Sequence, residues 1–168
     1  MIETRIEGLS LRLATQHDVP QILRFIRELA EYEKLLDMVV ADEAKLTATL
    51  FGDKPYAEVV IADYAGQPAG FALFFHNYST FLAKPGIYLE DLFVEPACRG
   101  VGVGKALITY LAKLAVERDC GRLEWSVLDW NQPAIDFYQS LGAVMLHDWR
   151  INRVTGSTLS QMAELFPG

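Results

Sequence analysis

Three glycines at alternate positions lie between two basic residues in the middle of the chain. The run reads Arg99-Gly100-Val101-Gly102-Val103-Gly104-Lys105 and joins an expected strand to an expected helix. Glycines leave backbone N–H groups unhindered and a helix N-terminus adds partial positive charge, so this glycine loop suits a pyrophosphate. A helix cap would account for one of these glycines, but it would not account for three glycines at alternate positions. We therefore expect a phosphate-binding loop.

Two nucleotide-binding motifs of similar appearance are excluded by single positions. A dinucleotide fingerprint, GxGxxG, starting at either of the first two glycines needs glycine where the chain has Lys105 or Leu107. A P-loop, GxxxxGK followed by Ser or Thr, needs a hydroxyl where Ala106 stands and a glycine where Arg99 stands. The phosphate ligand is therefore expected to be of another kind.

The pattern that remains, R-x-x-G-x-G, is carried by Arg99, Gly102 and Gly104. It resembles the acetyl-CoA motif of the GNAT acetyltransferase superfamily. Three further blocks, ILRFIRELAEYE at 22–33, YLEDLFV at 88–94 and WNQPAIDFY at 130–138, look like the diamine acetyltransferase branch, which includes spermidine/spermine and thialysine acetyltransferases. The blocks match in order from about Leu11 to Met162, which is most of the chain.

The resemblance implies a fold, a co-substrate and an assembly. The fold would be the GNAT acyl-CoA N-acyltransferase fold, of the α/β (α+β) class, with a mixed, mostly antiparallel twisted sheet flanked by helices. Acetyl-CoA would be the co-substrate, no metal would be needed, and the protein would form a homodimer. The residues expected to bind acetyl-CoA are Leu92, Phe93, Val94, Arg99, Gly100, Val101, Gly102, Val103, Gly104, Lys105, Asn131, Pro133, Ala134 and Tyr138.

Acetyl transfer to an amine requires a group that takes a proton, because an amine with a pKa of roughly 10.4 is mostly protonated at pH 7. Glu90 is the candidate, since it lies within an apolar strand where an unpaired carboxylate is costly. Its neighbour Asp91 is expected on the other face of the strand unless a bulge intervenes. The resemblance implies that Glu90 contacts the amine, either directly or through water. Carboxylates satisfied by backbone N–H groups or an internal arginine remain an equal alternative.

At the other end of the reaction the CoA thiolate leaves, and it gains modestly from a proton donor. Tyr138 matches the family's general acid; without that match, its helical spacing from Ile135 and Leu141 is typical of a core aromatic residue. Asn131 is expected to cap the same helix and also to contact the pantetheine arm. A covalent route through Cys98 is not favoured, because no histidine is near in sequence and family members transfer directly in a ternary complex.

The acceptor is expected to be a small cationic amine. By resemblance its binding residues are Tyr32, Glu33, Glu90, Asp91, Glu124, Trp125 and Ser126. The chain departs from polyamine-accepting members before Tyr88, where it reads NYSTF, and in a short loop between Gly142 and Trp149. A lysine-like or thialysine-like amine, or a short diamine, is therefore at least as plausible as a long polyamine. Acetylation of a protein or peptide amine and a non-catalytic acyl-CoA sensor are the rival functions.

Hydrophobic periodicity predicts the elements that position these residues. Strands are expected at about 9–14, 57–62, 69–78, 86–94, 123–128 and 149–154. Helices are expected from Asp18 or Thr15 through the stripe at 22–30, from Asp42 to about 52, over 103–118, from Asn131 to Leu141, and after Ser157. Gly142 is expected as a left-handed residue after its helix.

Composition places these elements in one globular chain. The 168 residues, 51% hydrophobic and without a linker, predict a single N-acetyltransferase domain over 1–168. A net charge of −7 disfavours nucleic acid and anionic membrane as partners. Two cysteines without ligand spacing, no apolar leader and no run of about 20 apolar residues predict a cytoplasmic protein that binds neither metal nor membrane.

Overall fold

A six-stranded sheet forms the centre of the first of two units, Met1–Leu128 and Asp129–Gly168, into which the computed structural model of residues 1–168 divides. The strands follow one another across the sheet in chain order, and every neighbouring pair is antiparallel except the last, which is parallel. The strands are β1 (Ile2–Glu3), β2 (Leu9–Leu13), β3 (Glu58–Tyr64), β4 (Gln67–Ser79), β5 (Lys84–Val94) and β6 (Leu123–Trp125). This mixed, mostly antiparallel sheet confirms the predicted class.

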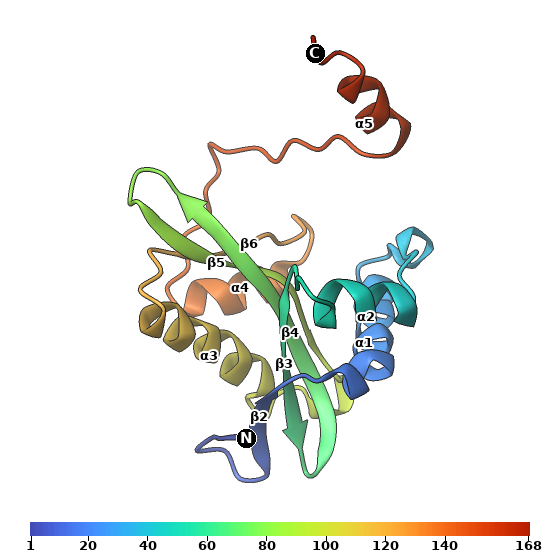
Figure 1. Ribbon diagram of the computed structural model, residues 1–168. Coiled ribbons are helices and arrows are strands. Elements are labelled where there is room, and N and C mark those ends of the chain that lie inside the picture. The colour runs from blue at the N-terminus through green and yellow to red at the C-terminus, as the bar shows by residue number, and fades with distance from the viewer. The chain divides into compact units, whose positions relative to one another are not determined.

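Helices cover the two faces of this sheet (Figure 1). On one face α1 (Val19–Tyr32) and α2 (Glu43–Phe51) pack on β3, β4 and β5, and on the other lies α3 (Val103–Glu117). The core beneath α1 and α2 is built from apolar residues that their helical spacing directs inward, among them Ile22, Phe25 and Leu46. The Asp42 carboxylate caps α2 by accepting from the Lys45 amide at 2.8 Å.

The β4–β5 ladder contains a bulge that decides which side chains face which helix. Leu73 lies opposite Asp91, whereas the next residue, Phe74, lies opposite Leu89, so Glu90 is an extra residue in β5. Directly paired residues project to the same face of a sheet. Leu73 packs against the core under α1, so Asp91 also projects to that face. An unbroken alternation would have put Asp91 on the α3 face with Leu89.

The second unit contains α4 (Gln132–Ser140) and α5 (Gly156–Ala163). Asn131 caps α4 as expected, accepting from the Ala134 amide at 3.4 Å, and Gly142 has the expected left-handed backbone with φ of +92°.

Two predictions about strands need correction. The strand expected at 149–154 is wrong, because this segment is irregular and no other strand pairs with it. The strand expected at 123–128 ends at Trp125, where its pairing with β5 stops. No helix is both long enough and apolar enough to cross a membrane.

Candidate active site

Two carboxylates lie side by side at the bulge of β5, but in different environments. Glu90 is exposed, whereas Asp91 is half-buried on the α1 face of the sheet. Burial, the charge of Glu90 and the charge of Glu33 together raise the pKa of Asp91 from 3.8 to about 6. The bulge therefore places two neighbouring carboxylates in different environments. Glu90 is open to water, whereas burial and nearby negative charge oppose the ionisation of Asp91.

Glu33 completes this carboxylate cluster of Glu33, Glu90 and Asp91. It is the residue that ends α1, and burial raises its own pKa. Its charge acts on Asp91 even though the two residues come from different elements. Three of the four acids expected at the acceptor site are thus brought together. A carboxylate whose ionisation is opposed by neighbouring carboxylates favours the approach of a cation.

The fourth acid, Glu124, is engaged elsewhere. Its carboxylate pairs with Arg122 at 3.1 Å and accepts from the Asn77 amide at 3.2 Å. Beside it on the same segment, Ser126 Oγ lies 2.7 Å from the hydroxyl of Tyr88. Trp125 pairs across the ladder with Leu89, one residue before the bulge. Glu124 is therefore paired with a partly exposed arginine and stands apart from the other three acids.

The C-terminal end of α1 is held next to the glycine loop. The guanidinium of Arg99 lies over the ring of Tyr32, 5.5 Å from its centroid, while its Nε donates to the carbonyl of Val94 at 3.2 Å. Near the middle of α1, Arg24 forms ion pairs with Glu28 at 2.9 Å and with Glu95, which follows β5. Residues expected for the acceptor and for acetyl-CoA are therefore adjacent here.

The last two strands of the sheet pair over a short stretch only. β5 and β6 are parallel and pair only at Ile87 with Leu123, Tyr88 with Glu124 and Leu89 with Trp125. No strand pairs with Leu92, Phe93 and Val94 on the side of β5 away from β4. Their backbone thus forms a sheet edge, which an extended ligand with amide groups fits by strand addition.

The glycine loop adopts a backbone conformation that favours glycine at two of its positions. Gly100 and Gly102 both have left-handed φ, +84° and +97°, and a Cβ at Gly100 would meet nothing within 4 Å. Gly102 caps α3, so the amides of Val103, Gly104 and Lys105 form the first turn, which has no intrahelical acceptors. The residues present fit a pyrophosphate, since open glycines and unpaired amides meet at a positive helix end.

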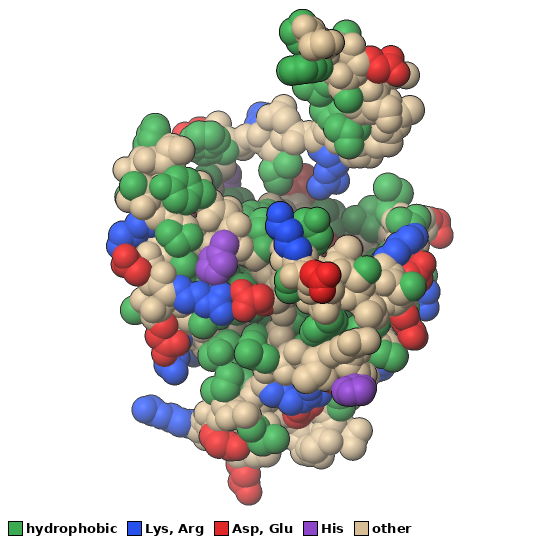
Figure 2. Space-filling model, viewed as in Figure 1, with side chains coloured by type: hydrophobic (Ala, Val, Ile, Leu, Met, Phe, Trp, Pro, Cys, Tyr) green, Lys and Arg blue, Asp and Glu red, His purple; other side chains and the backbone are tan.

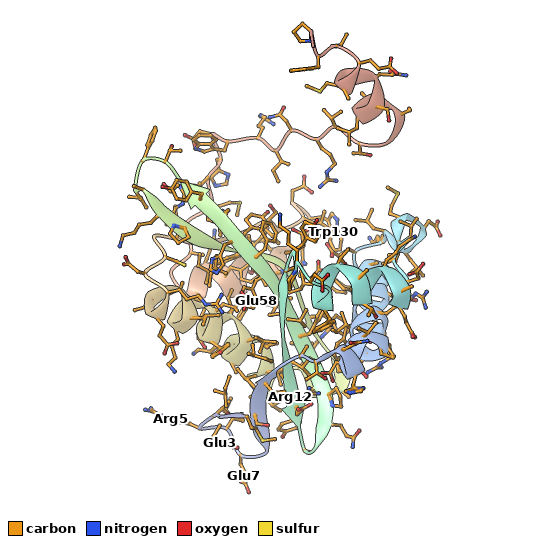
Figure 3. All side chains as sticks on the ribbon, viewed as in Figure 1. Glu3, Arg5, Glu7, Arg12, Glu58 and Trp130 are labelled. Atoms are coloured by element: carbon orange, nitrogen blue, oxygen red, sulfur yellow. The ribbon has the colours of Figure 1, made fainter.

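One contact to this loop was missed by sequence reasoning. A Cβ at Gly102 would lie 2.7 Å from Cδ1 of Ile6, so the N-terminal turn packs on the loop. Thr4 holds that turn together: its hydroxyl bonds the carbonyls of Ile6 and Leu9 at 3.2 and 2.8 Å. The charged neighbours Glu3, Arg5 and Glu7 are exposed around it (Figure 3). The sequence offers no signal for this contact, which depends on β1 returning along β2.

The remaining predicted site residues belong to the second unit. Asn131, Pro133, Ala134 and Tyr138 all lie at or in α4, with Asn131 buried at its N-cap. The rings of Phe137 and Tyr138 are 5.4 Å apart. These positions fit the helix expected from the sequence. The structure contains no group of three or more His, Cys, Asp or Glu side chains that could hold a metal ion.

Comparison with known proteins gives a family match over most of the chain. The model of the acetyltransferase (GNAT) family matches residues 22–143. The chain is 38% identical to thialysine N-epsilon-acetyltransferase of Bos taurus, over 91% of this chain and 96% of the relative. It is 36% identical to L-ornithine N5-acetyltransferase NATA1 of Arabidopsis thaliana, over 92% of this chain and 88% of the relative.

A solved structure agrees with the fold. An integron cassette protein from the mobile metagenome of V. cholerae superposes with a TM-score of 0.79 at 25% identity, covering 94% of this chain and 98% of its own.

Proposed function

The chain belongs to the acetyltransferase (GNAT) family and is an N-acetyltransferase that acts on an amine, and we propose that it moves the acetyl group of acetyl-CoA to a primary amine of a small cationic molecule. Transfer is direct, in a ternary complex. The observation that carries this proposal is the carboxylate cluster at the bulge of β5, beside a glycine loop built for a pyrophosphate.

Acetyl-CoA is held by the loop and the free edge of β5. The amides that begin α3 and the charges of Arg99 and Lys105 receive the pyrophosphate. The backbone of Leu92 to Val94 pairs with the amide groups of the pantetheine arm. Val101 shapes the loop between the left-handed glycines, and Asn131, Pro133 and Ala134 contribute from the start of α4.

The proton leaves the acceptor before bond formation. The ammonium group of the amine donates through water to Glu90, the exposed carboxylate at the bulge. The neutral nitrogen then attacks the thioester carbonyl, a C–N bond forms, and the C–S bond breaks. Tyr138 donates its phenolic proton to the departing thiolate and regains one from the nitrogen, which loses its second proton on becoming an amide.

The acceptor is a cation of lysine-like or diamine size. Glu33, Glu90 and Asp91 supply up to three negative charges. The pKa of Asp91 is raised by burial and by the two glutamates, and no lysine or arginine of the chain is among its causes. The related proteins are named for ornithine and thialysine, which are both amino acids with a side-chain amine. Tyr32, Trp125 and Ser126 line the binding site for the acceptor. Glu124 contributes least to binding the acceptor, because Arg122 already pairs with it.

The protein acts as a homodimer, as its resemblance to the diamine acetyltransferase branch implies.

A panel of amines tests this assignment. Ornithine, lysine, thialysine, putrescine, spermidine and a lysine peptide would each be incubated with acetyl-CoA, and free CoA measured with a thiol reagent. We expect release with the small amines and acetylation of the same amine by mass spectrometry. Release only with the peptide would assign a protein substrate instead. Binding of acetyl-CoA by calorimetry with no turnover on any amine would assign a sensor.

A further inference from the structure

A charged network lies on the opposite face of the sheet from Asp91. It joins Glu58 at the start of β3, His76 on β4 and Arg118 at the end of α3, and we call these three residues the rear network. In Figure 2 a histidine, a basic and an acidic side chain adjoin one another at the place where Figure 3 labels Glu58. None of the three belongs to the residues expected to bind either substrate.

The contacts of the rear network fix both its geometry and its protonation. The Arg118 guanidinium binds the Glu58 carboxylate through two hydrogen bonds, of 2.6 and 2.8 Å. His76 Nδ1 lies 3.0 Å from the carbonyl of Gly86, and because a carbonyl only accepts, Nδ1 carries the hydrogen. His76 Nε2 is then free to accept from Arg118 Nη1, at 2.8 Å. The network is complete with a neutral histidine and an arginine cation.

These bonds connect three strands and a helix at one level of the sheet. Glu58 belongs to β3, His76 to β4 and Gly86 to β5, and Arg118 caps α3. Glu58 pairs with Phe74 in the β3–β4 ladder. The register between β4 and β5 shifts between Leu73 and Phe74, so Glu58 lies opposite the bulge's end on β4. Arg118 also lies over the ring of Phe74, 5.9 Å from its centroid. The rear network therefore contacts β4 at the residue where the bulge begins.

Such a network contributes to geometry more than to stability. The side chains of Arg118 and Glu58 are 32% and 38% exposed, so water screens their attraction and the free energy of unfolding depends on it only modestly. A bidentate pair nevertheless restricts the relative position of the groups it joins. The feature that needs such restriction is the bulge, because a ladder that paired Glu90 as an ordinary residue would transfer Asp91 to the α3 face.

We propose that Glu58, His76 and Arg118 are positioning residues for acetyl transfer: they hold the β4–β5 bulge in register and so keep Asp91 on the α1 face, next to the exposed Glu90. This role rests on the proposed function of the carboxylate cluster. It acts through the backbone of β4 and β5 and involves no contact with either substrate.

Substitution at the helix end tests the role against a matched control. Arg118→Met removes both hydrogen-bonding arms, and Glu58→Gln keeps the side-chain volume while removing the charge. Arg118→Lys is the conservative variant. Asp119→Asn is the control, because Asp119 pairs with Lys84 at 2.6 Å at the same end of α3 without touching the rear network. Circular dichroism and thermal unfolding would establish that each variant folds.

We expect Arg118→Met and Glu58→Gln to lower kcat/KM for the amine about tenfold, because small displacements of catalytic groups are costly. The Kd for acetyl-CoA should stay within about twofold, Arg118→Lys should recover part of the loss, and Asp119→Asn should behave like the parent. The acid limb of the kcat/KM profile should move to lower pH in the two variants, because an Asp91 released from its shielded position ionises more easily.

A second readout does not depend on turnover. Carbon-13 NMR of aspartate carboxyl groups, with the Asp91 signal assigned by its loss in Asp91→Asn, gives the titration midpoint of Asp91 directly. We expect the midpoint to fall in Arg118→Met and Glu58→Gln but not in Asp119→Asn. If the parent acetylates no amine, the proposed function fails, and this titration alone decides the positioning role. Variants that unfold at lower temperature while keeping kcat/KM and the Asp91 midpoint would overturn it.

Discussion

The carboxyl group of Asp91 at the bulge of β5 lies close enough to Glu33, at the end of α1, for the charge of one to oppose ionisation of the other. Neither residue gains from this in stability, since burial disfavours the charged form of both and repulsion adds to this at Asp91. The arrangement is therefore one that folding alone would not select. It is consistent with a place kept ready for a cation.

Replacing Asp91 with Asn should stabilise the protein at neutral pH. The folded-state pKa of Asp91 is about 6 against an ordinary 3.8, so its ionisation destabilises the fold as pH rises from 3.8 to about 6. Above that range the cost is complete and amounts to about 3 kcal/mol as an upper estimate. Urea unfolding from pH 3.5 to 8 should show parent and Asp91→Asn converging at low pH and diverging by pH 7. The exposed Asp53→Asn provides the comparison; a parallel gap at every pH would contradict the shift.

Tyr138→Phe should separate catalysis from binding. Loss of the phenolic hydroxyl removes the proton donor to the thiolate, and general acid catalysis contributes on the order of 100-fold or more. We expect kcat to fall by about that factor, with the calorimetric Kd for acetyl-CoA nearly unchanged. Phe137→Leu, at the neighbouring position of α4, controls for helix packing. Full activity in Tyr138→Phe would remove this residue from the mechanism.

Gly102→Ala should weaken acetyl-CoA binding through two effects at once. The new methyl group meets Ile6 Cδ1 at 2.7 Å, and the backbone at φ of +97° is strained for any side chain. Gly66→Ala is the matched control, because Gly66 also has left-handed φ, +77°, but open space around it. Both variants should lose about 1 kcal/mol of stability, whereas only Gly102→Ala should raise the Kd for acetyl-CoA, by about tenfold. Equal affinities in the two variants would disprove a role for the loop.

Acid should selectively weaken the junction between β2 and α1. Arg12 binds Asp18 at 2.9 and 3.0 Å and Asp63 at 2.6 Å, and its hydrogen bonds lower the pKa of Asp18 below 3.8. This stabilisation is complete above pH 3.8 and is lost as pH falls through the depressed pKa. Asp18→Asn should cost about 2 kcal/mol at pH 7, with the gap from the parent closing toward pH 2 in chemical unfolding. Asp119→Asn, at an exposed ion pair, should cost little at any pH.

Features set by neighbouring residues along the chain were predictable, and those set by pairing between distant segments were not. The α1 stripe, the start of α2 after Asp42, the cap at Asn131 and the left-handed Gly142 follow from residue type and short spacing, and they are present. The contact of Ile6 with Gly102 depends on how the strand ladders align.

The bulge at Glu90 likewise comes from alignment between strands. From the sequence, regular alternation and a bulge were both possible at this position. The segment 149–154 shows the converse. Its apolar alternation is typical of a strand, but a strand exists only where a second one bonds to it.

The bulge also lets β5 differ in length at position 90 without any change in which side chains face inward. Exchanging Glu90 for another side chain leaves the register of β5 as it is, with Asp91 and Phe93 facing α1. Deleting the residue would leave a regular ladder in which Leu89 and Asp91 still pair with Phe74 and Leu73, so Asp91 and Phe93 would keep their face. Related chains that lack one residue here should therefore keep the same inward-facing residues on both sides of the gap.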